Sequence, residues 1–239
     1  MLFFLLVSFL SAVYGKTKSD GKIVVAYLTD WSGYDASKID YTVVTNVHYS
    51  FATLTEQGAV NIPSGLNPSL VDTVHAGGAV ISLAIGGDGG SEAYKKAVTP
   101  SVRQTTINSI ANVISKYRLD GVDIDWEFPQ KDDYDNYLAF LVALRKKLGP
   151  NAWISACTNV FPFIGKDGNY VKDASEFAKV LSFIFIMAYD INGSWNSITA
   201  PNAPLEDKSG NSPIDVKGSV QNWRKARFPY NQIVLGVPL

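Results

Sequence analysis

Three carboxylic acids recur at every second position of one short segment. The segment from Leu119 to Pro129 has the sequence LDGVDIDWEFP, in which Asp123, Asp125 and Glu127 alternate with apolar residues. Because side chains alternate between the two faces of a β-strand, the three carboxyl groups share one face and the apolar side chains share the other. Successive carboxyl groups then lie about 6–7 Å apart, the span of two strand residues.

A line of buried carboxyl groups is suited to proton transfer. Like charges at low dielectric constant do not all ionise, so at least one acid keeps its proton at a raised pKa. A general acid needs such a proton near neutral pH. Glu127, nearest the carboxyl end of the strand, is the predicted proton donor. Asp125, one step deeper, is expected to bond to the substrate or to Glu127, and Asp123 to share a proton with Asp125.

Two other arrangements also fit three acids on one strand. They would form a solvated face on an antiparallel edge strand, but the neighbouring predicted strands are too apolar for that. Carboxylate clusters also bind hard cations, although collinear carboxylates make poor chelate geometry. The two histidines, His48 and His75, are too far apart to favour zinc, and we expect them in the core and at the surface respectively. We therefore expect no metal and no cofactor.

The rest of the chain alternates short apolar runs with helical patterns. Strands are predicted at 22–28, 44–52, 79–85, 120–127, 153–159, 183–189 and 232–237. Helices are predicted at 107–117 and 134–148, from Asn67-Pro68, and more weakly near 173–181 and 216–227. This alternation predicts an α/β fold with a parallel sheet, either open and doubly wound or most of a barrel. No glycine-rich fingerprint follows the first strand, which argues against a dinucleotide cofactor.

The N-terminus and the composition limit the classes of protein to which the chain can belong. Residues 1–14, MLFFLLVSFLSAVY, are too short to span a bilayer, which takes roughly 20 apolar residues. They predict a signal peptide at 1–15 and a secreted domain at 16–239, without stable membrane insertion. The net charge of −1 gives no electrostatic basis for binding nucleic acid. Cys157, the single cysteine, is expected to be a buried structural thiol.

Residues 120–127, DGVDIDWE, resemble the D-x-x-D-x-D-x-E signature of family-18 glycoside hydrolases, the chitinases and their relatives. Further similarity lies at 187–190, MAYD, which resembles the family's M-x-Y-D strand. Tyr27 and Trp31 resemble its first-strand Y-x-x-x-W, and 48–52 and 234–238 resemble its second and seventh strands. The resemblance extends from about residue 22 to the last residue.

The resemblance implies a (β/α)₈ barrel and a retaining, substrate-assisted hydrolysis of chitin or other N-acetylglucosamine oligosaccharides. Glu127 would protonate the leaving oxygen and later act as a base towards water. Asp125 would orient the acetamido group whose oxygen attacks the anomeric carbon, and Asp123 would support Asp125. Tyr189 would donate a hydrogen bond to the acetamido oxygen.

Substrate contacts are expected at the carboxyl ends of the strands, where flat aromatic rings can stack on sugars. The residues predicted to contact the substrate are Tyr27, Trp31, Phe51, Met187, Asp190 and Trp195. Trp126, on the apolar face of the acidic strand, is instead expected to pack outward against the helices.

Two features depart from the family pattern. Ala84 replaces the serine of an S-x-G-G motif, which removes a hydroxyl group near Asp123. The sequence stops at Leu239, so the family's eighth strand is absent from it. In the family, that strand carries the tryptophan that forms the floor of the sugar-binding site. We therefore expect a C-terminally truncated barrel of about seven βα units. Because the edge strands of its sheet are unpaired, this chain alone should be poorly soluble or inactive. The complete protein is expected to be a monomer.

Two alternatives to a chitinase remain open. One is an endo-β-N-acetylglucosaminidase that acts on N-glycans. The other is a non-catalytic chitin-binding lectin on the same fold. Such lectins typically lack the acidic glutamate, whereas Glu127 is present here.

Overall fold

The computed structural model of the protein describes residues 21–210 and 212–238. The predicted signal peptide at 1–15 lies outside these residues. Within them, no helix is both long and apolar enough to span a bilayer.

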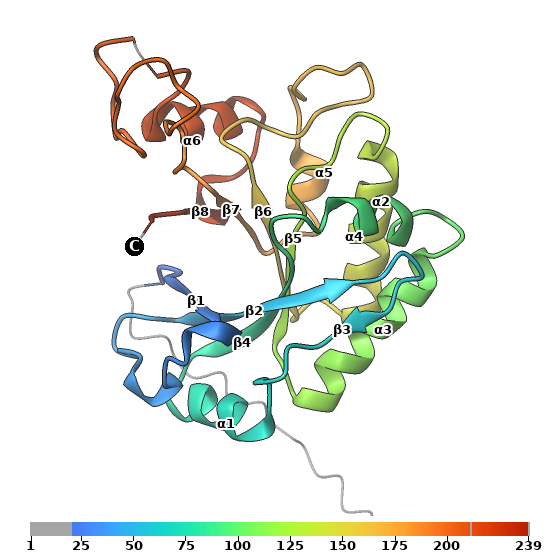
Figure 1. The fold of residues 1–239 in the computed structure, drawn as a ribbon. Coiled ribbons are helices and arrows are strands. Elements are labelled where there is room, and N and C mark those ends of the chain that lie inside the picture. The colour runs from blue at the N-terminus through green and yellow to red at the C-terminus, as the bar shows by residue number, and fades with distance from the viewer. Residues whose placement is uncertain (1–20, 211, 239) are drawn as a thin grey trace, which may run out of the picture.

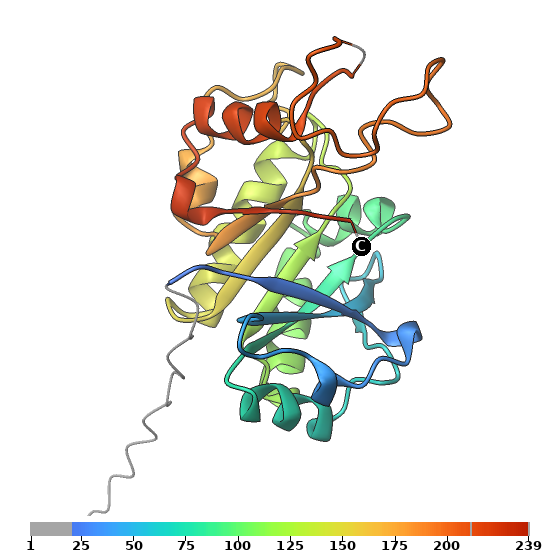
Figure 2. The same cartoon turned by 90° about the vertical axis from the view of Figure 1, so that its left-hand side faces the viewer.

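Seven parallel strands form one curled sheet in the order β1-β2-β4-β5-β6-β7-β8 (Figures 1 and 2). They are β1 (Val25–Thr29), β2 (Asn46–Leu54), β4 (Val80–Gly86), β5 (Gly121–Asp125), β6 (Trp153–Thr158), β7 (Phe183–Ile186) and β8 (Ile233–Leu235). Their spatial order follows the chain, as in a barrel and unlike an open doubly wound sheet. The fold is therefore an incomplete (β/α)₈ barrel, as predicted. Within the described residues, β1 and β8 end the path without pairing to each other.

Helices cover the convex side of the sheet (Figure 1). They are α1 (Pro68–Ala76), α2 (Ser91–Ala97), α3 (Arg103–Tyr117), α4 (Tyr134–Leu148), α5 (Ser175–Ala178) and α6 (Val216–Lys225), with short 3₁₀ turns η1 (Asp30–Ser32), η2 (Ala36–Lys38) and η3 (Tyr230–Gln232). The sequence did not predict α2 or β3 (Val60–Asn61), a short strand that pairs antiparallel with the end of β2. Both are too short to show a clear periodicity.

The helix ends follow local sequence signals. The side chain of Asn67 accepts a hydrogen bond from the Leu70 amide at 3.0 Å, and Pro68 opens α1, which confirms the predicted start. Helix α4 begins and ends where its apolar pattern does, and Gly149 follows it at φ +87°. Arg145, in its last turn, donates to the carbonyl oxygen of Gly149 at 3.0 Å. This contact stabilises the negative end of the helix.

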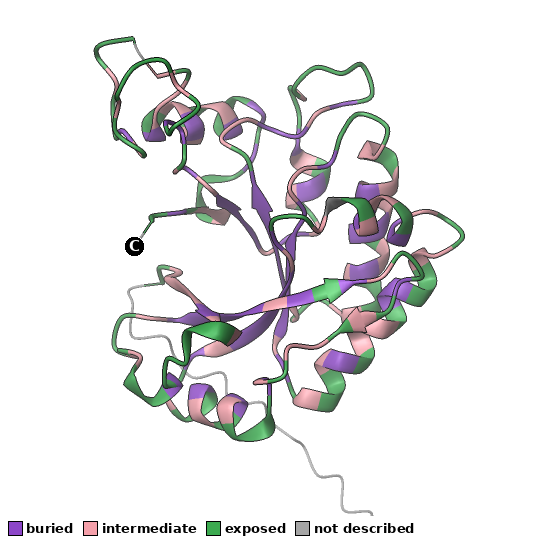
Figure 3. Ribbon diagram, in the orientation of Figure 1, coloured by how far each residue is buried: buried purple, intermediate pink, exposed green. Residues whose placement is uncertain are grey.

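The apolar face of β5 packs against the helix layer, as predicted. Strand β5 is buried along its whole length (Figure 3). Val122 and Ile124 are fully buried, and Trp126, just beyond the strand, is 1% exposed. The Trp126 ring stacks on Tyr94 of α2, with ring centroids 5.1 Å apart, and meets Tyr137 of α4 edge-on at 5.2 Å. Because this face is turned outward, the acidic face must be turned into the barrel.

We expect Trp126→Phe to lower the free energy of unfolding by about 1–2 kcal/mol, because the smaller ring leaves a cavity between α2 and α4. The indole nitrogen has no hydrogen-bond partner, so the substitution removes packing alone. Urea unfolding at one pH measures the change. Trp31→Phe, at a side chain that is 73% exposed, is the matched control and should change stability by less than about 0.5 kcal/mol. Equal effects at the two positions would contradict the packing assignment.

Candidate active site

The three predicted acids follow one another from the barrel interior towards its carboxyl end. Asp123 is completely buried, Asp125 is 3% exposed and ends β5, and Glu127 is half-buried. The predicted strand included Glu127, whereas the observed strand stops two residues earlier. Glu127 therefore belongs to the loop that leaves the barrel mouth, where a substrate has access.

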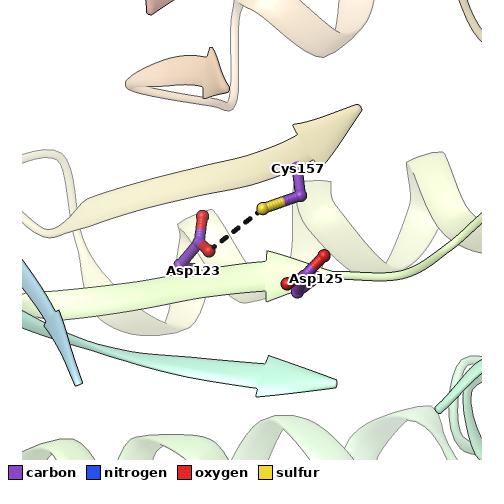
Figure 4. A group of neighbouring side chains, drawn as sticks. All are labelled: Asp123, Asp125 and Cys157. Carbon is purple, nitrogen blue, oxygen red and sulfur yellow. Dashed lines mark hydrogen bonds between the residues drawn. The ribbon is translucent and has the colours of Figure 1, made fainter. Parts of the chain in front are cut away.

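Groups from three other strands converge on the carboxylate of Asp123. Ser155 of β6 donates to its Oδ1 at 2.5 Å, and Tyr27 of β1 donates to its Oδ2 at 2.8 Å. Cys157 of β6 donates to the same Oδ2 at 3.4 Å (Figure 4). His48 of β2 lies with its Nδ1 3.5 Å from Oδ2. Because these strands surround the barrel interior, their convergence shows that the acidic face points inward.

The surroundings of Asp123 favour its ionised form. Burial raises the pKa of a carboxyl group, but His48 and the hydrogen bonds from Ser155 and Tyr27 outweigh burial and leave the pKa of Asp123 below its ordinary value. An ionised carboxylate only accepts hydrogen bonds, which matches the three donors directed at it.

Asp125 has the opposite environment. Burial raises its pKa to about 8, with further contributions from the negative charges of Asp123 and Glu127. Its Oδ1 is buried and has no hydrogen-bond partner. These surroundings favour the protonated form of Asp125 beside an ionised Asp123 near neutral pH.

Glu127 is the outermost acid of the line. Burial raises its pKa, and the negative charge of Asp88 raises it further. Asp88 follows β4 in a glycine-rich turn, and sequence reasoning missed it because such a segment has the composition of an ordinary loop. Glu127 thus combines partial exposure with a tendency to keep its proton, the two properties that a proton donor needs.

The segment after β7 brings Tyr189 to the same end of the barrel. Strand β7 stops at Ile186, so the predicted strand was three residues too long and Met187 and Tyr189 lie just beyond it. Burial raises the pKa of the half-buried Tyr189 hydroxyl, and the nearby acids Asp125 and Glu127 are among the groups that raise it further. Met187 is half-buried. Asp190 is exposed, and its Oδ1 accepts a hydrogen bond from Asn202 at 2.6 Å.

Aromatic rings continue from the acids towards the surface. Phe51 lies between Tyr27, with ring centroids 6.3 Å apart, and Trp31, with centroids 6.1 Å apart and an interplanar angle of 27°. The indole of Trp31 is 73% exposed and available for stacking. Trp195 is 66% exposed in the loop after β7, where its ring lies over Gly193. Contacts therefore run from Asp123 through Tyr27 and Phe51 to Trp31. Trp195 is not part of this series of contacts.

A small cavity of about 100 Å³ begins at Phe128, the residue after Glu127, and at Cys157. It is bounded by the loops that follow β5 and β6, and its lining is largely apolar and aromatic. The lining residues are Phe128, Pro129, Gln130, Cys157, Thr158, Asn159, Phe161, Pro162, Phe163, Ile164 and Tyr170. An apolar recess next to a polar centre is the usual composition of a ligand site.

Two residues of the acid cluster were predicted only as core residues. His48 is 1% exposed and Cys157 is 4% exposed, which confirms their predicted burial. Ligand-type atoms of Asp123, Asp125 and Cys157 lie within 4.8 Å of one another (Figure 4). Asp123 and Cys157 are joined by a hydrogen bond. The expectation that the site requires no metal stays a prediction.

Comparison with known proteins identifies the family of the chain. Residues 23–239 match the family model described as "Glycosyl hydrolases family 18". The chain belongs to this family. The family-18 chain resembles a chitinase from Rhizomucor miehei, with which it shares 30% sequence identity. The crystal structure of that chitinase superposes with a TM-score of 0.83, and the alignment covers 90% of this chain and 62% of that one. A Glu-to-Gln mutant of a class V chitinase from Nicotiana tobaccum, solved in complex with NAG4, is 26% identical with a TM-score of 0.79. The alignment covers 91% of this chain and 66% of that one.

Among curated relatives, a "chitinase-like effector" from Moniliophthora roreri is 36% identical over 90% of this chain and 57% of its own length. A second, from Moniliophthora perniciosa, is 32% identical over 93% of this chain and 56% of its own length. The family-18 chain thus spans little more than half the length of these relatives.

Proposed function

We propose that the protein hydrolyses β-1,4-linked N-acetylglucosamine polymers by a retaining, substrate-assisted mechanism. The observation that carries this proposal is the line of three acids along β5 and the loop that follows it. The pKa of buried Asp123 is held below its ordinary value, burial raises the pKa of Asp125 to about 8, and half-buried Glu127 has a raised pKa at the barrel mouth. Membership of glycosyl hydrolase family 18 supports the reaction class.

In the proposed reaction, Glu127 donates its proton to the glycosidic oxygen as the bond from that oxygen to the anomeric carbon breaks. The acetamido oxygen of the same sugar attacks the anomeric carbon and forms an oxazolinium ion. Asp125 forms a hydrogen bond with the acetamido group and orients it, while Tyr189 donates to the acetamido oxygen. Water then attacks the anomeric carbon and gives a proton to Glu127, while the bond from that carbon to the acetamido oxygen breaks. Two successive displacements at the same carbon leave the product with the original configuration.

The proposed substrate is a neutral chitin oligosaccharide. The exposed ring of Trp31, backed by Phe51 and Tyr27, offers a stacking surface close to the acids. Met187, Asp190 and Trp195 remain proposed contacts at the same barrel end. We further propose a secreted, cofactor-independent monomer formed after removal of residues 1–15.

One observation favours a second candidate, chitin binding without hydrolysis. The two most identical relatives named above are called chitinase-like effectors, a name that leaves catalysis open. In this alternative the same aromatic and acidic groups would bind the sugar, but no bond would be cleaved. A binding measurement alongside an activity assay separates the two candidates.

We expect the protein to cleave N-acetylglucosamine oligomers and to leave fully deacetylated oligomers and cellulose oligomers uncut, because the nucleophile is the substrate's own acetamido oxygen. Chromatography of the products measures this, and a thiazoline analogue of the intermediate should inhibit. Efficient cleavage of the deacetylated oligomers would refute the mechanism. Chitin binding without any cleavage would favour the second candidate.

A further inference from the structure

We propose that His48 is a positioning residue of this site: its protonated imidazole holds Asp123 in the ionised form and so keeps the shared proton on Asp125. The inference rests on the proposed function for its catalytic consequence. The charge state of the pair, however, can be tested without any activity measurement.

The geometry places the imidazole beside Asp123. His48 is 1% exposed, Asp123 is completely buried, and His48 Nδ1 lies 3.5 Å from Asp123 Oδ2. Nδ1 makes no hydrogen bond, and its separation from Oδ2 is that of an ion pair. The ring stacks on Phe183 of β7, with centroids 6.0 Å apart, and meets Tyr27 edge-on at 5.0 Å. These rings hold the imidazole in place.

The groups that face His48 leave Asp123 as its counter-charge. In register, Tyr27 of β1 and Ser82 of β4 flank His48, and both are neutral. From β7 the contact is the apolar Phe183. A buried imidazolium without a nearby negative charge would be strongly disfavoured, so its proton depends on Asp123.

The residue that neighbours Asp123 on β4 is Ala84, which has no side-chain donor. Ala84 pairs with Asp123 in the β4–β5 register and is fully buried, so a serine at this position would place a hydroxyl group beside the carboxylate. That donor is missing here. The ion pair with His48 and the hydrogen bond from Ser155 support Asp123 instead.

Loss of the imidazolium would change where the shared proton resides. Asp123 and Asp125 are coupled and hold one proton between them at neutral pH. Without the positive charge of His48, Asp123 would compete with Asp125 for this proton. A fraction of the molecules would then have an ionised Asp125 beside Glu127 and would react slowly, although the sugar contacts would be intact.

Nitrogen-15 NMR of labelled histidine tests the charge directly. The chain has only two histidines, and His75→Gln assigns their signals in a protein purified without a histidine tag. We expect His48 to show two protonated ring nitrogens at pH 5.5 in the wild type and one in Asp123→Asn. His75, which contacts Asp120 at 2.9 Å, should not respond to Asp123→Asn. A neutral His48 in the wild type at this pH would overturn the proposal, whether or not the protein cleaves chitin.

Kinetics test the consequence. We expect His48→Gln to lower kcat by roughly 10-fold or more, with KM changed less than about twofold and an altered pH profile of kcat. Addition of Ala84→Ser should recover part of the loss, because a hydroxyl donor again supports ionised Asp123. Phe183→Leu, which disturbs packing around the same ring, is the control and should lower stability without altering the pH profile.

Two kinetic outcomes would contradict the positioning role. One is an unchanged kcat and pH profile in His48→Gln. The other is an altered pH profile in Phe183→Leu that matches that of His48→Gln, since packing alone would then explain the effect. A wild-type protein that fails to cleave any substrate would instead refute the proposed function, and the NMR result would still decide the charge of His48.

Discussion

Glu127→Gln is expected to lower kcat on a fluorogenic N-acetylglucosamine oligomer by at least about 100-fold, while oligosaccharide binding largely persists. The amide keeps the shape of the side chain but has no proton to donate to the leaving oxygen. Because Glu127 is only half-buried and lies beyond the end of β5, the substitution should not disturb the fold. Steady-state kinetics together with calorimetric binding of a chitin oligomer measure both effects.

Glu92→Gln is the matched control for this prediction. Glu92 is 78% exposed on α2, where it pairs with Lys95 at 2.6 Å, and its substitution should leave kcat unchanged. Turnover of Glu127→Gln within a few-fold of the wild type would rule out Glu127 as the proton donor. Loss of binding as well as turnover would show instead that Glu127 mainly holds the sugar.

Asp125→Asn should flatten the dependence of stability on pH. An acid whose pKa is raised by folding binds its proton more tightly in the folded state. Its contribution to the free energy of unfolding is therefore complete below the pKa of the unfolded state and is lost as pH rises through the pKa of the folded state. For Asp125 this window extends from 3.8 to about 8. At 1.36 kcal/mol per pKa unit, the loss has an upper bound of roughly 6 kcal/mol. Asparagine has no proton to lose and therefore removes this slope.

Urea unfolding at several pH values between 4 and 8 measures the prediction. The raised pKa of Glu127 adds a slope of the same sign to the dependence of unfolding free energy on pH. The lowered pKa of Asp123 affects stability only below this pH range. Asp125 should therefore account for most of the change in stability between pH 4 and 8. Asp72→Asn, at an exposed carboxylate paired with Arg118, is the control and should leave the slope unaltered. An equal slope in the wild type and in Asp125→Asn would contradict a buried, protonated Asp125. The same variant should also lower kcat, because the acetamido group loses its partner.

Local patterns in the sequence determined much of this protein. The alternation along β5 assigned Asp123, Asp125 and Glu127 to one face and Trp126 to the other, because the side-chain period of a strand is fixed by its backbone geometry. The bounds of α4 followed from apolar spacing and from Gly149, signals that act within a few residues. The alternation of strands and helices, with the family resemblance, predicted the barrel.

Only the tertiary structure decided which groups meet the acids. Tyr27, His48 and Ser155 are 96, 75 and 32 positions from Asp123 in the chain, and strand order and register bring them to its carboxylate. No local pattern encodes such a meeting. The division of charge between Asp123 and Asp125 depends on it, because burial and neighbouring dipoles set a pKa and both are products of packing. The sequence alone therefore identified three acids in a line, and the folded barrel decides the direction in which the pKa of each is shifted.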